Sequence, residues 1–210
     1  MQASATLSHQ VMGALCTQGA APEGTILDQA RQLEQFLAAV EKRAFQIARL
    51  AIRDADDALD IVQDAMLQLA RKYAQRPSEQ WKPLFYRILQ NRIRDCQRCR
   101  MVRNRVFGWL PGMRSDPELE IGDPYEATPD DAQGPADRVV TDEAMRALEH
   151  ALKDLPARQL EAFLLRTMEG MDVAETAEAM GCTEGSVKTH YSRAVHALRE
   201  RLQDSWGGSA

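Results

Sequence analysis

Apolar residues recur every three or four positions along most of the chain, a spacing that is typical of amphipathic helices. In the first half of the chain this spacing defines three segments, which begin near Leu33, Asp54 and Leu84. The spacing resumes at Val139 and, after a second interruption, at Leu160. No segment alternates apolar and polar residues as a half-buried strand would. We therefore predict an all-α protein.

A stretch rich in proline, glycine and acidic residues interrupts the helical pattern in the middle of the chain. It extends from Phe107 to about Gly134, and its composition cannot bury enough apolar surface to fold alone. We interpret it as a flexible linker between two small helical domains. The predicted order is a flexible leader over residues 1–27, a helical domain over 28–106, an acidic linker over 107–138 and a second helical domain over 139–205.

The second domain contains a pattern that is typical of a helix–turn–helix. Gly181 suits the left-handed turn after a first short helix, and Thr183 can cap the helix that follows. This second helix has one apolar stripe, which predicts a buried side: Val187, Tyr191, Ala194, Leu198 and Leu202. Its other side carries polar donors that could reach the DNA major groove: Ser186, Lys188, Thr189, Ser192 and Arg193. The alternative is a solvated surface helix, but the short turn and the lack of acidic residues on this side favour DNA.

The net charge of −5 over 210 residues conceals an uneven distribution. Eight cations lie between Lys82 and Arg105, opposed only by Asp95, whereas ten acidic residues lie in residues 116–143, opposed only by Arg138. Because the acidity is confined to one block, the net charge does not exclude a nucleic-acid partner.

The sequence offers little support for a membrane segment, a disulfide framework or a metal site. No apolar run approaches the roughly 18 residues that a membrane helix needs, and the first residues lack a basic signal start, so we expect a cytoplasmic protein. Cys96 and Cys99 form a single CxxC without the further ligands that a zinc site requires. We therefore expect incidental thiols and no cofactor.

Three stretches resemble bacterial RNA polymerase sigma factors of the extracytoplasmic-function (ECF) class. "DALDIVQDAMLQLARKY" (57–73) and "LFYRILQNRIRDCQRCR" (84–100) resemble region 2 of that class. The stretch from "LKDLPARQLEAF" through "GCTEGSVKTHYSRAVHALRERL" (152–202) resembles region 4. The resemblance covers residues 30–106 and 139–203. It implies a transcription initiation factor, not an enzyme, that recognises the −35 duplex and the −10 element and promotes strand opening.

The resemblance also implies roles for individual residues. Asp60, Gln63 and Asp64 would bind the coiled coil of the largest subunit of core RNA polymerase, whose basic surface attracts carboxylates. The −10 element would be held by a cationic track with capture of unpaired bases, for which the candidates are Tyr86, Asn91, Arg92, Arg94 and Arg98. We assign Phe85 to the core because it follows the apolar stripe. The polar side of the region 4 helix would contact the −35 element.

Further partners implied by the resemblance are the polymerase flap, promoter DNA and an anti-sigma factor, with no small-molecule substrate. The acidic linker would thread through the positively charged interior of the polymerase. A spacer without contacts of its own is the alternative interpretation of the linker.

At four positions the sequence departs from the usual pattern of the class. Leu84 stands where a tryptophan is usual, and Trp81 could replace it in space. Thr176 stands at an apolar position, where a buried hydroxyl would need a backbone acceptor. His190 and Val195 stand where many members have arginine, which leaves the −35 sequence open.

Two competing interpretations remain at this stage. Asp56, Asp57 and Asp60 spell DDxxD, which binds magnesium diphosphate in all-helical prenyl and terpene synthases. No second acidic motif accompanies it, and acidic residues are also common at a helix start. A stand-alone helix–turn–helix regulator is the other interpretation, but it leaves the arginine-rich block unexplained.

Overall fold

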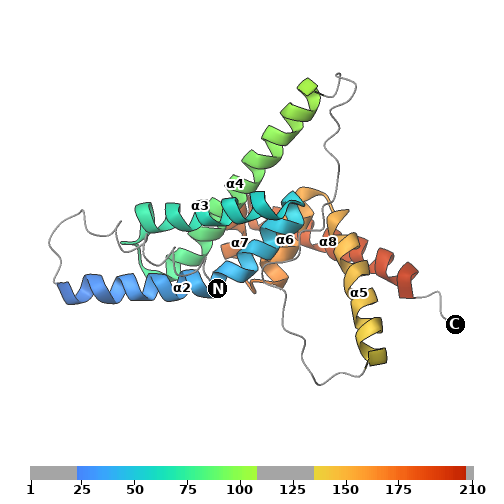
Figure 1. The fold of residues 1–210 in the computed structure, drawn as a ribbon, viewed down its shortest axis with the longest axis horizontal. Helices are drawn as coiled ribbons and strands as arrows, with labels where there is room; N and C mark the ends of the chain where they lie inside the picture. The colour runs from blue at the N-terminus through green and yellow to red at the C-terminus, as the bar shows by residue number, and fades with distance from the viewer. Residues whose placement is uncertain (1–22, 108–134, 207–210) are drawn as a thin grey trace. The chain divides into compact units, whose positions relative to one another are not determined.

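The computed structural model describes residues 23–107 and 135–206, and these form seven α-helices and no strand (Figure 1). This confirms the predicted all-α class. The predicted leader and linker lie mostly outside the described residues. The helices are α2 (Glu23–Ile52), α3 (Ala55–Tyr73), α4 (Ser78–Phe107), α5 (Pro135–Lys153), α6 (Ala157–Thr167), α7 (Val173–Met180) and α8 (Glu184–Trp206). They form two compact units, one built on α2 to α4 and the other on most of α5 to α8.

Three helices begin earlier than the apolar pattern predicted, and one of them is α4, which begins at Ser78 and not near Leu84. α2 begins at Glu23, although the pattern starts only at Leu33, and α5 begins at Pro135, inside the stretch predicted as linker. Among the added residues of α2 whose side chains are described, Leu27 is 58% exposed. Helix propensity without an apolar stripe leaves no periodic signal, so the sequence pattern missed these turns.

The first unit is a three-helix bundle in which each helix packs against the other two. Its largest fully buried side chains include Phe45, Trp81, Phe85 and Tyr86. The core position predicted for Phe85 is therefore confirmed. The indole nitrogen of Trp81 donates to the carbonyl oxygen of Tyr73 at 3.2 Å, which satisfies one of the free carbonyls at the end of α3.

The junction between α2 and α3 follows the predicted polar break. Arg53 adopts a left-handed conformation (φ 61°) just after α2, and Asp54 then caps α3 by accepting from the backbone N–H of Asp57 at 3.0 Å. The predicted helix start is confirmed. α2 and α3 are therefore joined by a tight turn, and the Asp54 cap fixes the residue at which α3 begins.

The second unit places its core between α6 and α8, with α5 also packed against α8. Completely or nearly completely buried side chains from α5, α6 and α8 and from the turns beside them fill it: Leu152, Leu155, Leu160, Leu164, Leu165, Met171, Val187, Ala194 and Leu198. α7 and α8 thus stand on an apolar base that holds the turn between them. None of the described helices contains an apolar stretch long enough to cross a membrane.

Candidate functional site

The turn between α7 and α8 has the geometry that the sequence predicted. Gly181 has φ +63°, its N–H donates to the carbonyl of Glu178 at 3.2 Å, and the N–H of Cys182 donates to the carbonyl of Ala177 at 3.0 Å. These two bonds form a Schellman motif, which requires the left-handed residue. The hydroxyl of Thr183 then accepts from the N–H of Ser186 at 3.2 Å and caps α8.

α7 is held at its start by a capping box that the sequence analysis did not identify. The carboxylate of Asp172 accepts from the N–H of Glu175 at 2.8 Å, and the carboxylate of Glu175 accepts from the N–H of Asp172 at 2.8 Å. Thr176 is completely buried, and its hydroxyl donates to the carbonyl of Asp172 at 2.6 Å. The predicted need of Thr176 for a backbone acceptor is therefore confirmed.

The polar side of α8 presents most of the residues expected to contact DNA. Lys188, Thr189, Ser192 and Arg193 are exposed, and Ser186 is partly buried. The Thr189 hydroxyl donates to the carbonyl of Gly185 at 2.9 Å. Within the described part of the chain, the side chains of Lys188, Ser192 and Arg193 have no hydrogen bond or ion pair, so their donors face outward.

The apolar stripe predicted for α8 is only partly correct. Val187, Ala194 and Leu198 are buried, but Tyr191 and Leu202 are partly exposed. The ring of Tyr191 stacks on Phe163 with centroids 6.2 Å apart, and the guanidinium of Arg166 lies 5.8 Å from the centroid of the Tyr191 ring. A phenol that lies at the rim of the core keeps its polar end in water, which apolar spacing alone does not indicate.

On α3, Asp60 and Asp64 are exposed and Gln63 is partly exposed. Val62 and Met66 are buried on the opposite side. The three candidate polymerase-binding residues therefore share one outward side of a helix whose other side is fixed in the bundle core.

The candidates for −10 binding on α4 do not form one surface. Asn91 and Arg98 are exposed and Arg94 is partly exposed, but Tyr86 is completely buried. Tyr86 packs edge-on against Phe85 with ring centroids 5.1 Å apart, so it is a core residue and cannot stack on a base in this conformation. Its aromatic character suggested a DNA contact, but burial of the ring decides against one.

Arg92 also departs from the expected set, because it points toward α3. Its guanidinium lies 3.7 Å from the carboxylate of Asp64 and donates to the side-chain oxygen of Gln68 at 3.3 Å. Asn91, Arg94 and Arg98 follow one another at intervals of three and four residues and so lie on one side of α4. Arg92 lies off that side and joins the exposed side of α3 instead.

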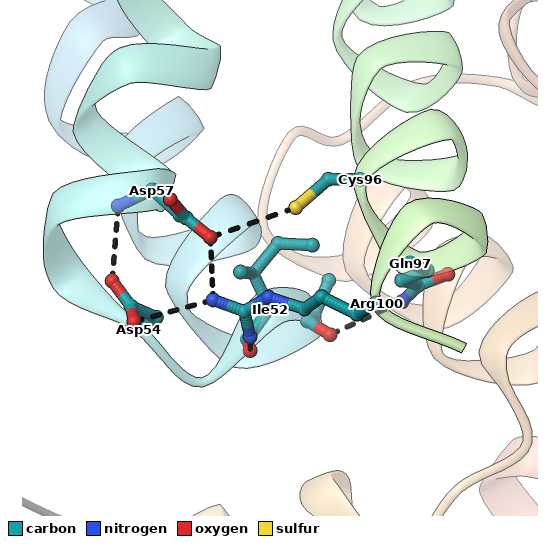
Figure 2. A network of polar contacts seen from close by, with 7 residues as sticks. Ile52, Asp54, Asp57, Cys96, Gln97 and Arg100 are labelled. Carbon is teal, nitrogen blue, oxygen red and sulfur yellow. Dashed lines mark hydrogen bonds and ion pairs between the residues drawn. The ribbon is translucent and has the colours of Figure 1, made fainter. Parts of the chain in front are cut away.

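A polar network joins α4 to the α2–α3 turn, and Figure 2 shows its residues. The guanidinium of Arg100 donates to the Asp57 carboxylate at 2.5 Å and to the carbonyl of Ile52 at 2.6 Å, and it lies 3.2 Å from the Asp54 carboxylate. Arg100 therefore neutralises the acidic helix start and satisfies a carbonyl at the end of α2. This function of Arg100 was not foreseen, because the sequence does not show which arginines turn inward.

Cys96 and Gln97 belong to the same network. The Cys96 thiol donates to the Asp57 carboxylate at 3.7 Å, and the Gln97 amide donates to the carbonyl of Ala51 at 3.1 Å (Figure 2). Burial raises the pKa of the Cys96 thiol, and the nearby Asp57 carboxylate raises it further. Of the DDxxD residues, Asp57 is therefore engaged by Arg100 and Cys96. No cluster of potential metal ligands occurs among the described residues.

Comparison with known proteins gives matches in both units. The family model for sigma-70 region 4 matches residues 145–198. The ECF RNA polymerase sigma factor BldN of Streptomyces coelicolor is 35% identical over 104 residues, which are 50% of this chain and 39% of BldN. The RNA polymerase sigma-E factor of the same organism is 30% identical over 172 residues, which are 81% of this chain and 86% of that protein.

A solved structure gives the same fold. The sigma factor RpoE of Bartonella quintana, crystallised with the anti-sigma factor NepR, is 24% identical to this chain. The similarity covers 81% of this chain and 96% of RpoE, with a TM-score of 0.61. Since the similarity to the sigma-E factor extends over most of both proteins, the chain belongs to the ECF class of RNA polymerase sigma factors, which are regulatory proteins of transcription initiation.

Proposed function

We propose that the two helical units divide the work of transcription initiation between them. The first unit would bind core RNA polymerase and the unpaired −10 strand, and the second would bind the −35 duplex. The observation that carries this proposal is the similarity to the Streptomyces coelicolor sigma-E factor, which runs over 81% of this chain. A stand-alone regulator would need only the helix–turn–helix and not the first unit.

The exposed side of α3 is the proposed contact with the polymerase. Asp60 and Asp64 supply two carboxylates and Gln63 an amide from one rigid helix. Carboxylates on a fixed surface attract a basic partner, such as a coiled coil rich in lysine and arginine, and fix its register. Because Arg92 contacts Asp64, we include Arg92 in this surface rather than in the DNA surface.

The proposed −10 surface is the side of α4 that carries Asn91, Arg94 and Arg98. Two guanidinium groups and an amide provide the cationic track and the hydrogen-bond donors that hold a single strand. Capture of unpaired bases on this side would offset the cost of opening the duplex, because every captured base shifts the equilibrium toward the open form. Tyr86 is left out because its ring is buried.

The proposed −35 surface is the polar side of α8 near its N-terminus. Lys188, Ser192 and Arg193 project outward there, and the caps at Thr183 and Gly181 hold the helix at a fixed angle to α7. An α-helix presented in this way fits the major groove, where its donors can reach base edges and phosphates.

We also propose an anti-sigma factor as a regulatory partner and the cytoplasm as the site of action. The first rests on the Bartonella quintana sigma factor, which was crystallised with the anti-sigma factor NepR. The second rests on the requirement for polymerase and chromosomal DNA. By the same reasoning, the chain uses binding energy rather than covalent catalysis, and no cofactor enters the proposal.

Reconstitution with core polymerase on a library of promoters tests the whole proposal. We expect the chain to associate with core polymerase and to start transcripts at defined positions that share a −35 and a −10 sequence. A chain that binds a specific duplex without polymerase and starts no transcript with it would instead be a stand-alone regulator.

A further inference from the structure

Asn91 and Arg94 form a close side-chain pair on one side of α4, where Asn91 is exposed and Arg94 is partly exposed. One terminal nitrogen of Arg94 donates to the side-chain oxygen of Asn91 at 2.6 Å. The Nε of Arg94 donates to the backbone carbonyl of Gln90 at 3.1 Å, which holds the guanidinium against the helix. The pair is therefore anchored to the backbone and does not depend on a long, freely rotating arginine.

This contact fixes which way the amide of Asn91 faces. A guanidinium has five N–H donors and no acceptor, so only the oxygen of the amide can face it. The amide nitrogen of Asn91 must then point away from Arg94, and Asn91 is exposed. The pair therefore presents N–H donors to a molecule that approaches α4. Its one strong acceptor, the side-chain oxygen of Asn91, already accepts a hydrogen bond from the guanidinium of Arg94.

A donor-rich pair of this kind discriminates between the bases of an unpaired strand. A free asparagine binds adenine with both of its groups, because its oxygen accepts from N6 while its nitrogen donates to N7. Arg94 occupies one of the two lone pairs of that oxygen and places a positive charge beside the other, so the amino groups of adenine and cytosine are disfavoured there. On the edge that a base turns to the major groove, O4 of thymine and O6 of guanine are acceptors and fit the exposed N–H groups, whereas adenine and cytosine present amino groups at these positions.

We infer that Arg94 is a specificity-determining residue, which acts through Asn91 to select thymine or guanine over adenine at one position of the −10 strand. The inference rests on the proposed −10 surface and adds a base preference to it. One well-placed bidentate contact separates right from wrong bases by about tenfold or more, and we expect a preference of about that size.

The experiment uses holoenzyme, made from the full chain and core polymerase, on bubble templates with a randomised unpaired −10 strand. Bound templates are sequenced for the unsubstituted chain and for Asn91→Ala, Arg94→Ala and Arg98→Ala. Asn91→Ala identifies the base position that Asn91 contacts, because the preference there disappears. At that position the unsubstituted chain should enrich thymine or guanine, and Arg94→Ala should shift the enrichment about tenfold toward adenine.

Arg98→Ala is the matched control, because it removes the same charge one turn further along α4. Arg98 is exposed and lies 3.9 Å from Asp95, and it follows Asn91 by about two turns of helix. Its loss should weaken binding to all templates alike and leave each base preference unchanged. Affinity for core polymerase, which should stay constant, shows that each variant is folded.

Two results would contradict the inference, and a third would contradict the proposed −10 surface on which the inference rests. If Arg94→Ala behaves as Arg98→Ala does and keeps every preference, Arg94 contacts phosphate only. If the unsubstituted chain prefers adenine or cytosine where Asn91 acts, the orientation of the amide is wrong. If Asn91→Ala changes no preference and Arg98→Ala does not weaken binding, the −10 surface itself is misplaced.

Discussion

Two glycines beside the turn of the helix–turn–helix have opposite conformational requirements. Gly181 has φ +63°, whereas Gly185 lies in the first turn of α8 and has no positive φ. A Cβ at Gly181 would meet no atom within 4 Å, and one at Gly185 would meet only the Thr183 hydroxyl at 3.9 Å. The two positions therefore differ in backbone strain and not in available space.

We predict that Gly181→Ala lowers the free energy of unfolding by about 1–2 kcal/mol, because a Cβ is strained in the left-handed region. Gly185→Ala should raise it by about 0.5 kcal/mol, because alanine loses less backbone entropy in a helix. Urea unfolding of both variants, followed by circular dichroism, measures the difference. Equal effects of the two substitutions would show that the turn does not require its left-handed residue.

The Cys96 thiol gives a second prediction at the scale of single residues. Its pKa is raised by burial and by the Asp57 carboxylate, so Asp57→Asn should lower the Cys96 pKa. The pH dependence of iodoacetamide labelling, read by mass spectrometry, measures this change, and the exposed Cys99 serves as an internal reference. The curve for Cys96 should move to lower pH in the variant. An unmoved curve would mean that the Asp57 carboxylate does not contribute to this pKa.

The same shift has a defined sign for stability. Because the folded pKa of Cys96 lies above the unfolded value, its contribution to stability is complete below the unfolded pKa. That contribution is lost as the pH rises through the folded pKa. Ionisation of Cys96 therefore lowers the free energy of unfolding only at alkaline pH and does not change it near neutral pH.

The sequence allowed correct predictions of local backbone conformation, but not of the contacts that side chains make with distant residues. Gly181, Thr183 and Thr176 were interpreted correctly because their conformations and bonds depend on neighbours within five residues. The DNA contact predicted for Tyr86 was wrong and the contacts of Arg100 were not foreseen, because burial and long-range pairing decide their roles. Arg100 contacts Asp57 across 43 positions of sequence, and no periodic pattern carries that information.

At the scale of elements, α7 is a short helix of eight residues whose stability rests on its ends. The reciprocal bonds between Asp172 and Glu175 satisfy N–H groups at its start, and the Schellman motif satisfies carbonyls at its end. So short a helix is marginal without such caps and without its packing. The position of α8 against α7 therefore depends on capping residues that never contact DNA.

We predict that Asp172→Ala lowers the free energy of unfolding by about 1 kcal/mol, the usual cost of a lost N-terminal cap. It should also weaken −35 duplex binding by the holoenzyme, because α7 would fray and α8 would lose its support. Glu178→Ala is the control, since Glu178 is an exposed acidic residue of the same helix. Amide hydrogen exchange of α7 distinguishes the two variants. Unchanged protection in Asp172→Ala would contradict the role of the capping box.

The apolar pattern located every helix with a buried stripe and missed turns that lack one. The start of α3 was predicted because Asp54 interrupts the pattern there, whereas α4 begins at Ser78, six residues before the predicted start near Leu84. The first turns of α2 and α5 were not predicted either, because the sequence has no sustained apolar stripe there. The division of α4 into an outward side and a side facing α3 emerges only once the bundle is assembled.

At the scale of the whole molecule, the net charge of −5 works against DNA binding by the free chain. The proposed DNA surfaces are local and cationic, and the proposed polymerase surface is local and acidic. Polymerase binding would therefore place an acidic surface against a basic partner and leave the cationic sides of α4 and α8 to the promoter. This arrangement predicts that losses on the two surfaces can be separated by experiment.

We predict that Asp60→Ala weakens association with core polymerase. Arg193→Ala should leave that association unchanged, but it should reduce the free energy of binding to the −35 element by about 1–3 kcal/mol if Arg193 contacts a base. Asp60 lies on α3 and Arg193 on α8, in separate units, so in the double variant the two free-energy losses should add. Fluorescence titration with core polymerase and competition between −35 duplexes measure the two quantities independently.

Each substitution has a matched control on the same unit. Arg199→Ala removes a second exposed charge of α8 further from the N-terminal turns, and Asp95→Ala removes an exposed carboxylate of α4 outside the polymerase surface. Both should change their respective affinities by less than about 0.5 kcal/mol. If Asp60→Ala and Arg193→Ala instead impair the same step to the same extent, the two units share one contact, and the proposed division between polymerase and upstream DNA is wrong.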